Sequence, residues 1–123
     1  MQRIVIAGRE MELLLTVAAL EEIDARFGSY EQMVERMRDR RTYAKAMCGA
    51  IAALGNGALQ YRGKEPDISE KWVCRHVAPG ELAELDKAVA EAFSEGWRME
   101  AESGERPQDV VLEEMEAQKK TGA

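Results

Sequence analysis

The spacing of apolar residues along the chain predicts a mainly α-helical protein that begins with a short β-hairpin. Residues 3–15, RIVIAGREMELLL, carry the β-branched Ile4, Val5 and Ile6 and then Ala7-Gly8. Glycine tolerates the positive φ that a tight hairpin turn needs, so this pattern predicts two short strands. The stretch from Met11 to Leu15 also contains good helix formers, so a helical second arm remains the alternative.

Beyond the hairpin, apolar residues recur at spacings of three and four, the period of an amphipathic α-helix. Thr16 is suited to cap a helix that runs through Phe27. Ser29, followed three residues later by Gln32, has the pattern of a capping box and predicts the start of a second helix. The short connection between these two helices indicates that they pack as neighbours.

The segment from about Thr42 to Leu59 is apolar or small on most of its sides, which predicts a central helix with little exposure to water. Gly55-Asn56-Gly57 weakens the last turns of this helix. We interpret the triplet as a kink or a close helix contact, because it lacks the spacing and the Lys-Ser/Thr pair of a phosphate-binding Walker loop.

Residues that typically end or begin a helix predict the bounds of the fourth and fifth helices. Gly63 and Pro66 end the central helix and keep the next connection extended. Asp67 or Ser69 is suited to cap a fourth helix, and Pro79 to begin a fifth helix at its first turn. The fourth helix carries Ile68, Trp72, Val73 and Val77, and the fifth, which runs to about Glu100, carries Leu82, Leu85, Val89, Phe93 and Trp97.

After Ala101 the chain becomes rich in charge and poor in aromatic residues. Residues 100–123 hold seven acids and three bases, a composition typical of a flexible or conditionally helical acidic tail. We therefore expect one helical domain over residues 1–101 and a tail over 102–123. The tail contains an apolar patch, which could fold onto a partner or onto the core and comprises Val110, Val111, Leu112 and Met115.

Length and charge narrow the class of protein. The 123 residues suit one domain, and 46% hydrophobic residues are enough for one core. The longest apolar run, Met47 to Leu54, is far shorter than the roughly 20 residues that span a bilayer, so we expect no membrane association and a cytoplasmic location. The net charge of −6 argues against nucleic acid as a partner.

A local cluster of arginines, at positions 36, 38, 40 and 41, is interpreted as the solvated end of a helix, with an anion site as the alternative.

Residues that could support catalysis or bind a metal are sparse. The single histidine, His76, stands beside Cys74, and a Cys-x-His pair is too small a ligand set for zinc. Cys48 and Cys74 lie among apolar residues, which predicts buried thiols rather than a disulfide. The many carboxylates alternate with bases, as on solvated helix faces. We expect no enzyme activity, no catalytic residues, no cofactor and no metal.

The order of these segments resembles a known family. A hairpin with a glycine turn, the helix TVAALEEIDARFGS, an alanine-rich central helix, the connection YRGKEPDISEKWV and the terminal AVAEAFSEGW resemble the tail assembly chaperones of long-tailed phages and prophages, over roughly residues 3 to 100. Ala7-Gly8 replaces the Asn-Gly that is associated with this kind of hairpin.

The resemblance implies a non-enzymatic protein of the host cytoplasm that is absent from the mature virion. Such a protein binds the tape measure protein and helps to recruit tail tube subunits around it during tail assembly. Self-association along an elongated partner is left open. The competing hypothesis is a small helical regulatory or adaptor domain that binds another protein, which would account for the same helices and charge.

Two sets of residues are candidates for partner binding. Aromatic residues and arginine are favoured in interface centres, so Tyr61, Arg62 and Trp72 are predicted to border a groove for a partner helix. The alternative is that this stretch only reverses the chain and that Trp72 anchors the next helix on the core. The apolar patch of the tail is the second candidate.

Overall fold

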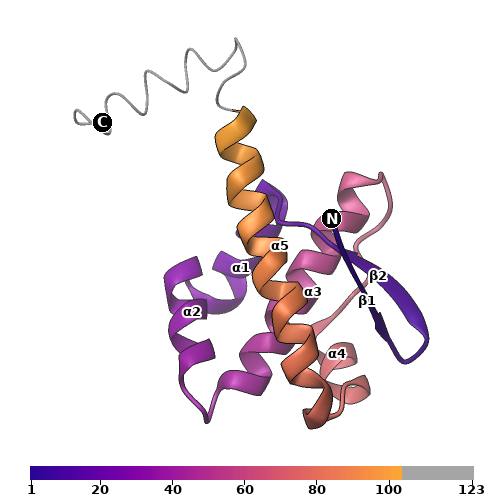
Figure 1. Ribbon diagram of the computed structural model, residues 1–123, viewed down its shortest axis with the longest axis vertical. Coiled ribbons are helices and arrows are strands. Elements are labelled where there is room, and N and C mark those ends of the chain that lie inside the picture. The colour runs from indigo at the N-terminus through magenta and orange to yellow at the C-terminus, as the bar shows by residue number, and fades with distance from the viewer. Residues whose placement is uncertain (104–123) are drawn as a thin grey trace.

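The computed structural model describes residues 1–103, which form an antiparallel β-hairpin followed by five α-helices (Figure 1). The expected fold, mainly helical with an N-terminal hairpin, is confirmed. The predictions for the tail from residue 104 onward, including Val110, Val111, Leu112 and Met115, lie outside the described residues. The elements are β1 Gln2–Ile6, β2 Arg9–Leu13, α1 Val17–Phe27, α2 Tyr30–Arg38, α3 Tyr43–Tyr61, α4 Glu70–His76, the 3₁₀ turn η1 Pro79–Glu81, and α5 Leu82–Ser103.

The hairpin is closed by a two-residue turn in which both residues have positive φ. Ala7 has φ 52° and Gly8 has φ 82°, which is the type I′ geometry that matches the twist of the flanking strands. The strands pair from Ile6 with Arg9 to Gln2 with Leu13. Alternate side chains face the core, so the interpretation of the second arm as a helix is wrong.

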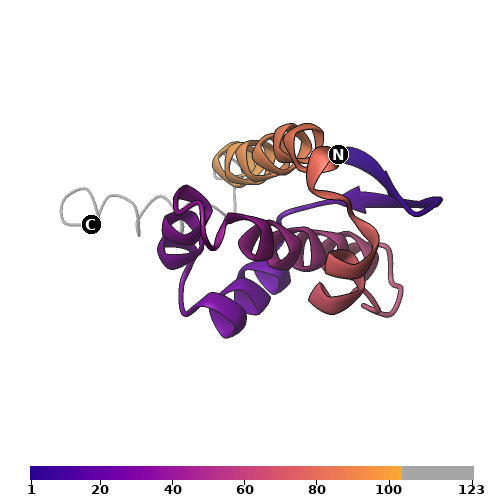
Figure 2. The same cartoon turned by 90° about the horizontal axis from the view of Figure 1, so that it is seen from below.

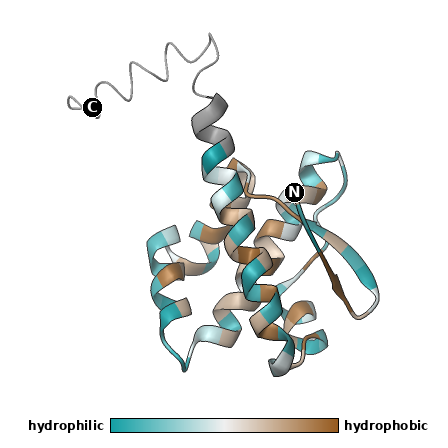
Figure 3. Cartoon of the chain, in the orientation of Figure 1, coloured by the Kyte–Doolittle hydropathy of each residue, from teal (hydrophilic) through white to brown (hydrophobic). Residues whose placement is uncertain are grey.

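Helix α3 is the centre of the fold. Every residue from Ala46 to Ala58 is buried. Figure 2 shows α5 and the hairpin on one side of α3, with α1 and α4 on the other, and α3 contacts each of these elements as well as α2. Figure 3 shows the segment that follows β2 as hydrophobic and the connection after α3 as hydrophilic. A helix contacted on so many sides has to be apolar on most sides, as its sequence is.

The caps of α1 and α2 are formed as the sequence predicted. The hydroxyl of Thr16 accepts a hydrogen bond from the Ala19 N–H at 3.0 Å, and that of Ser29 accepts one from the Gln32 N–H at 3.0 Å. Gly28 ends α1 with φ 99° and donates its N–H to the Asp24 carbonyl. These caps satisfy backbone groups that a helix end leaves without partners.

The glycines near the end of α3 allow neighbouring segments to approach its backbone. A Cβ atom at Gly57 would lie 2.6 Å from the carbonyl oxygen of Leu14, and one at Gly55 would lie 2.7 Å from Cδ1 of Ile68. The interpretation of Gly55-Asn56-Gly57 as a close contact is therefore confirmed. Helix α3 continues through the triplet to Tyr61.

Asn56, between these two glycines, fixes the connection that follows α3. Its Nδ2 donates to the carbonyl of Ile68 at 2.8 Å, and its Oδ1 accepts the Ile68 N–H at 2.9 Å. The same Nδ2 lies 3.2 Å from the carboxylate of Glu22 on α1. The amide is buried, at 6% exposure, and all its polar atoms have partners. One side chain therefore binds both backbone polar groups of Ile68 and ties α1, α3 and the connection together.

The start of α4 and α5 differs in detail from the prediction. Ser69, rather than Asp67, caps α4 by accepting the Trp72 N–H at 2.9 Å, and Val77 lies just beyond the end of the helix. Pro79 begins the 3₁₀ turn η1 and not α5 itself, which starts at Leu82. A proline at the start of this turn has the same advantage, since its missing N–H would have no partner there.

Helix α5 packs along the hairpin and α3. A Cβ atom at Gly96 would lie 2.5 Å from that of Leu15, and Gln2 donates to Glu95 at 2.9 Å. Tyr43 at the start of α3 donates to Asp86 at 2.6 Å, and burial together with this hydrogen bond raises the pKa of Tyr43 to about 12. Trp97, which was expected on the apolar face, is 40% exposed.

Replacing Ala7 with asparagine should stabilise the protein. The left-handed conformation costs an alanine about 1 kcal/mol, whereas asparagine adopts it readily. Chemical denaturation of Ala7→Asn should show a gain in unfolding free energy of about this size. The same substitution at Ala90, an exposed position within α5, should lower stability by about 0.5 kcal/mol because asparagine is a poorer helix former. If Ala7→Asn lowered the free energy of unfolding as Ala90→Asn does, the conclusion that Ala7 is strained in the turn would be contradicted.

Replacing Asn56 with alanine should destabilise the protein by about 3 kcal/mol, because both polar groups of Ile68 would be buried without partners. Urea unfolding measures this loss directly. The matched control is Gln60→Ala, an exposed site one turn further along α3, which should change stability by less than about 0.5 kcal/mol. Equal effects at the two positions would show that the Asn56 hydrogen bonds contribute little.

Candidate protein-binding groove

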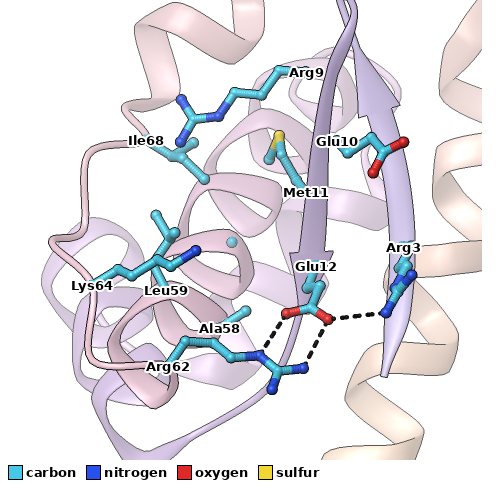
Figure 4. A pocket seen from close by; sticks show the side chains of 11 residues that line it. Arg3, Arg9, Glu10, Met11, Glu12, Ala58, Leu59, Arg62, Lys64 and Ile68 are labelled. Carbon is cyan, nitrogen blue, oxygen red and sulfur yellow. Dashed lines mark hydrogen bonds and ion pairs between the residues drawn. The ribbon is translucent and has the colours of Figure 1, made fainter.

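A groove of about 310 Å³ lies between β2 and the C-terminal part of α3 with the connection that follows it (Figure 4). We call it the hairpin groove. Its floor is apolar and includes Met11, Ala58, Leu59 and Ile68. Its charged rim consists of Arg3, Arg9, Glu10, Glu12, Arg62 and Lys64.

Two ion pairs connect the hairpin to the α3–α4 connection across the groove. Arg62 donates Nε and Nη2 to the two carboxylate oxygens of Glu12, at 3.0 and 2.9 Å, and Arg3 lies 3.6 Å from the same carboxylate. At the turn end of β2, Arg9 donates to Asp67 at 2.7 Å. The hydrogen bond from Arg62 lowers the pKa of Glu12, and that bond in turn raises the pKa of Arg62. Exposed pairs of this kind are weak, so a ligand could displace them at little cost.

The rim of the groove is positive in an acidic protein. Four cations and two carboxylates line it, a surplus of two positive charges against −6 for the whole chain. Among the side chains of residues 1–98, Lys64 has no ion-pair partner. An apolar floor under a positive rim suits a peptide segment that carries both apolar and acidic side chains.

The structure brings two of the three predicted partner-binding residues to this region. Arg62 lines the groove directly. Trp72 is half-buried behind it and lies 5.7 Å from the guanidinium of Arg9, which lines the groove. Tyr61 is 63% exposed and does not line the groove. Their role in partner binding stays a prediction.

Sequence reasoning missed Arg9, Met11 and Lys64. These residues meet only because the hairpin folds over the end of α3, and the ion pairs that join the two segments are separated by at least 50 positions. Local periodicity carries no signal for such contacts. The only available hint was Asn56, a single amide in an otherwise apolar run.

A second pocket, of about 410 Å³, lies between α1, α2 and α3 and is lined by Arg26, Arg36 and Lys45. Of the four arginines at positions 36 to 41 that the sequence singled out, only Arg36 lines it, with its guanidinium 5.7 Å from the ring of Phe27. Arg26 is engaged by Glu22 and Glu70. The other three arginines are exposed near the end of α2, as expected for a solvated helix end.

No cluster of three or more potential metal ligands occurs within residues 1–103. His76 is exposed, with its Nδ1 2.8 Å from the carbonyl of Trp72 and its ring stacked on that side chain. Within the same residues, no helix is both long and apolar enough to cross a membrane.

The two thiols have different environments. Cys48 on α3 is buried as predicted, whereas the prediction for Cys74 is wrong, because it lies on the exposed side of α4. Helix α4 is amphipathic, and Val73 rather than its neighbour Cys74 faces the core. Burial, with a smaller contribution from a hydrogen bond to Cys74, raises the pKa of Cys48 to about 12.

A thiol-alkylating reagent such as iodoacetamide should therefore label one cysteine per folded chain at pH 8. Because the thiolate is the reactive species, Cys48 should react only after unfolding. Cys74→Ser should abolish the fast reaction, while Cys48→Ser should leave it unchanged. Fast labelling that survives in Cys74→Ser would contradict the burial of Cys48.

Comparison of the chain with protein-family models, with curated proteins and with solved structures gave no match.

Proposed function

We propose that the protein is a non-catalytic tail assembly chaperone of a long-tailed phage or prophage. In this role it binds the tape measure protein in the host cytoplasm, helps to recruit tail tube subunits, and leaves before the tail is mature. The hairpin groove is the observation that carries the proposal, because an open apolar floor with a positive rim suits a protein segment.

The arrangement of elements also supports the proposal. The segments that carry the family resemblance are the hairpin, α1, α3, the α3–α4 connection and α5, and each of them has the secondary structure that the resemblance implies. The hairpin and the connection, which flank the groove, are two of these segments.

In this mechanism the chaperone contributes affinity and position but no chemistry. Apolar residues of the tape measure segment cover Met11 and Ile68, and its carboxylates replace Glu12 and Asp67 as partners of Arg62 and Arg9. Lys64, which has no ion-pair partner among the side chains of residues 1–98, pairs with a further carboxylate of that segment. Since each displaced pair is exposed, the net electrostatic gain from replacing it is small.

The proposal is tested by co-expressing the chain with the tape measure and tail tube proteins of its own genome. The wild type should elute with the tape measure protein in size exclusion. The groove variant Arg62→Ala/Lys64→Ala should bind at least about tenfold more weakly, a loss of about 1.4 kcal/mol, with a melting temperature close to that of the wild type.

The matched control is Arg38→Ala/Arg40→Ala, which removes the same charge from exposed positions outside the groove. It should bind as the wild type does. Equal weakening in both variants would show that net charge, and not the groove, governs binding. A well-folded wild type that forms no complex with either protein would overturn the proposal in favour of the regulatory or adaptor domain.

A further inference from the structure

The only two cysteines of the chain meet where α4 packs on α3. Cys48 is buried on α3, Cys74 is exposed on α4, and both thiols are free. Although the second half of α3 and the whole α3–α4 connection separate them along the chain, the two side chains lie within hydrogen-bonding distance of each other. Any disulfide within one chain has to join these two residues.

The packing of α4 on α3 accounts for this contact. Glu70 and Cys74 are four residues apart and are therefore neighbours on one side of α4. The Oε1 atom of Glu70 lies 3.3 Å from the position that a Cβ atom would take at Gly49, which directly follows Cys48 on α3. The side of α4 that carries Cys74 is thus placed against the part of α3 that carries Cys48.

The two thiols differ in their access to solvent. Cys74 is exposed to a dissolved oxidant, whereas Cys48 is 5% exposed. Redox-sensitive cysteines are typically accessible and lie next to a second cysteine that reacts with the first oxidation product. Burial raises the pKa of Cys48 to about 12, so it reacts slowly with reagents in solution. Its contact with Cys74 gives it a high effective concentration toward that one sulfur atom.

We propose that Cys48 and Cys74 are a redox-sensitive pair, which a hydroperoxide converts into a disulfide between α3 and α4. The Cys74 thiolate attacks one oxygen of hydrogen peroxide, the O–O bond breaks, and Cys74 becomes a sulfenic acid. The Cys48 thiolate then attacks the Cys74 sulfur, the S–O bond breaks, and the departing oxygen takes up a proton and leaves as water. Overall, the two thiols lose two hydrogen atoms and the peroxide is reduced to two molecules of water.

The disulfide restrains one wall of the hairpin groove. The chain between Cys48 and Cys74 includes the α3–α4 connection and supplies Arg62, Lys64 and Ile68 to the groove. The bond adds a covalent attachment to the hydrogen bonds by which Asn56 holds Ile68. This inference concerns the free protein and does not depend on the proposed function.

Treatment of the reduced full chain with hydrogen peroxide under native conditions tests the proposal. Trypsin leaves Cys48 and Cys74 on separate peptides, residues 46–62 and 72–75, so the disulfide is detected as these two peptides linked in a non-reducing mass spectrum. The link should form at a rate independent of protein concentration, and dithiothreitol should reverse it. A Cys74 that stops at the sulfenic or sulfinic acid, or that forms a disulfide-linked dimer, would overturn the proposal.

Two variants test the role of each thiol when dimedone, which traps sulfenic acids, is present during the oxidation. Cys48→Ala should trap at least about tenfold more sulfenic acid than the wild type, because Cys48 otherwise consumes it. Cys74→Ser should trap none under the same conditions, since Cys48 is buried. Equal trapping in the wild type and in Cys48→Ala would show that Cys48 does not react with the oxidised Cys74, and would contradict the pair.

Thermal unfolding shows whether the folded chain accommodates the bond. Because a disulfide restrains the unfolded chain, the oxidised wild type should melt at least about 5 °C above the reduced wild type. Peroxide-treated Cys48→Ala should show no such rise, and it controls for the oxidation of methionine. A lower melting temperature in the disulfide form would show that the bond distorts the packing of α4 on α3, which is incompatible with a pair already in contact.

Discussion

The buried amide of Asn56 is the interaction on which the arrangement around the groove depends. Its oxygen and nitrogen bind the N–H and the C=O of Ile68, and thereby attach the connection after α3 to the helix itself. Without this amide, the two polar groups of Ile68 could not be buried at low cost. The connection would then no longer be attached to α3 by hydrogen bonds at this point. One wall of the hairpin groove would lose its fixed position.

The same part of the fold depends on residues that lack side chains. Gly55 and Gly57 flank Asn56, and they allow Ile68 and the backbone of Leu14 to approach α3 more closely than any Cβ atom would permit. Leu14 also donates its N–H to the Leu54 carbonyl, so the chain that leaves β2 is attached at the same level of α3. Both walls of the groove, β2 and the connection, are therefore positioned by contacts with one short stretch of α3. Such contacts make a groove that exists before a ligand arrives.

The features that the sequence predicted correctly are local. The caps formed by Thr16 and Ser29 and the glycine turn at Ala7-Gly8 each depend on residues a few positions apart, where pattern and structure are directly linked. The burial of Cys74 was wrong because a helix as short as α4 gives too few turns for its apolar face to be recognised. Among the candidate site residues, Arg62 was predicted, but its partner Glu12 was not. Nothing in either segment indicates that positions 12 and 62 meet, since that contact follows from the packing of the hairpin on α3.

The most direct test of this account is the hydrogen exchange of the Ile68 amide under native conditions. If Asn56 holds the connection as described, this amide should exchange only when α3 separates from the connection, far more slowly than that of Asp67, which is exposed and lies one residue away. Comparable exchange at Ile68 and Asp67 would show that the connection is not attached to α3. The groove would then have no fixed wall.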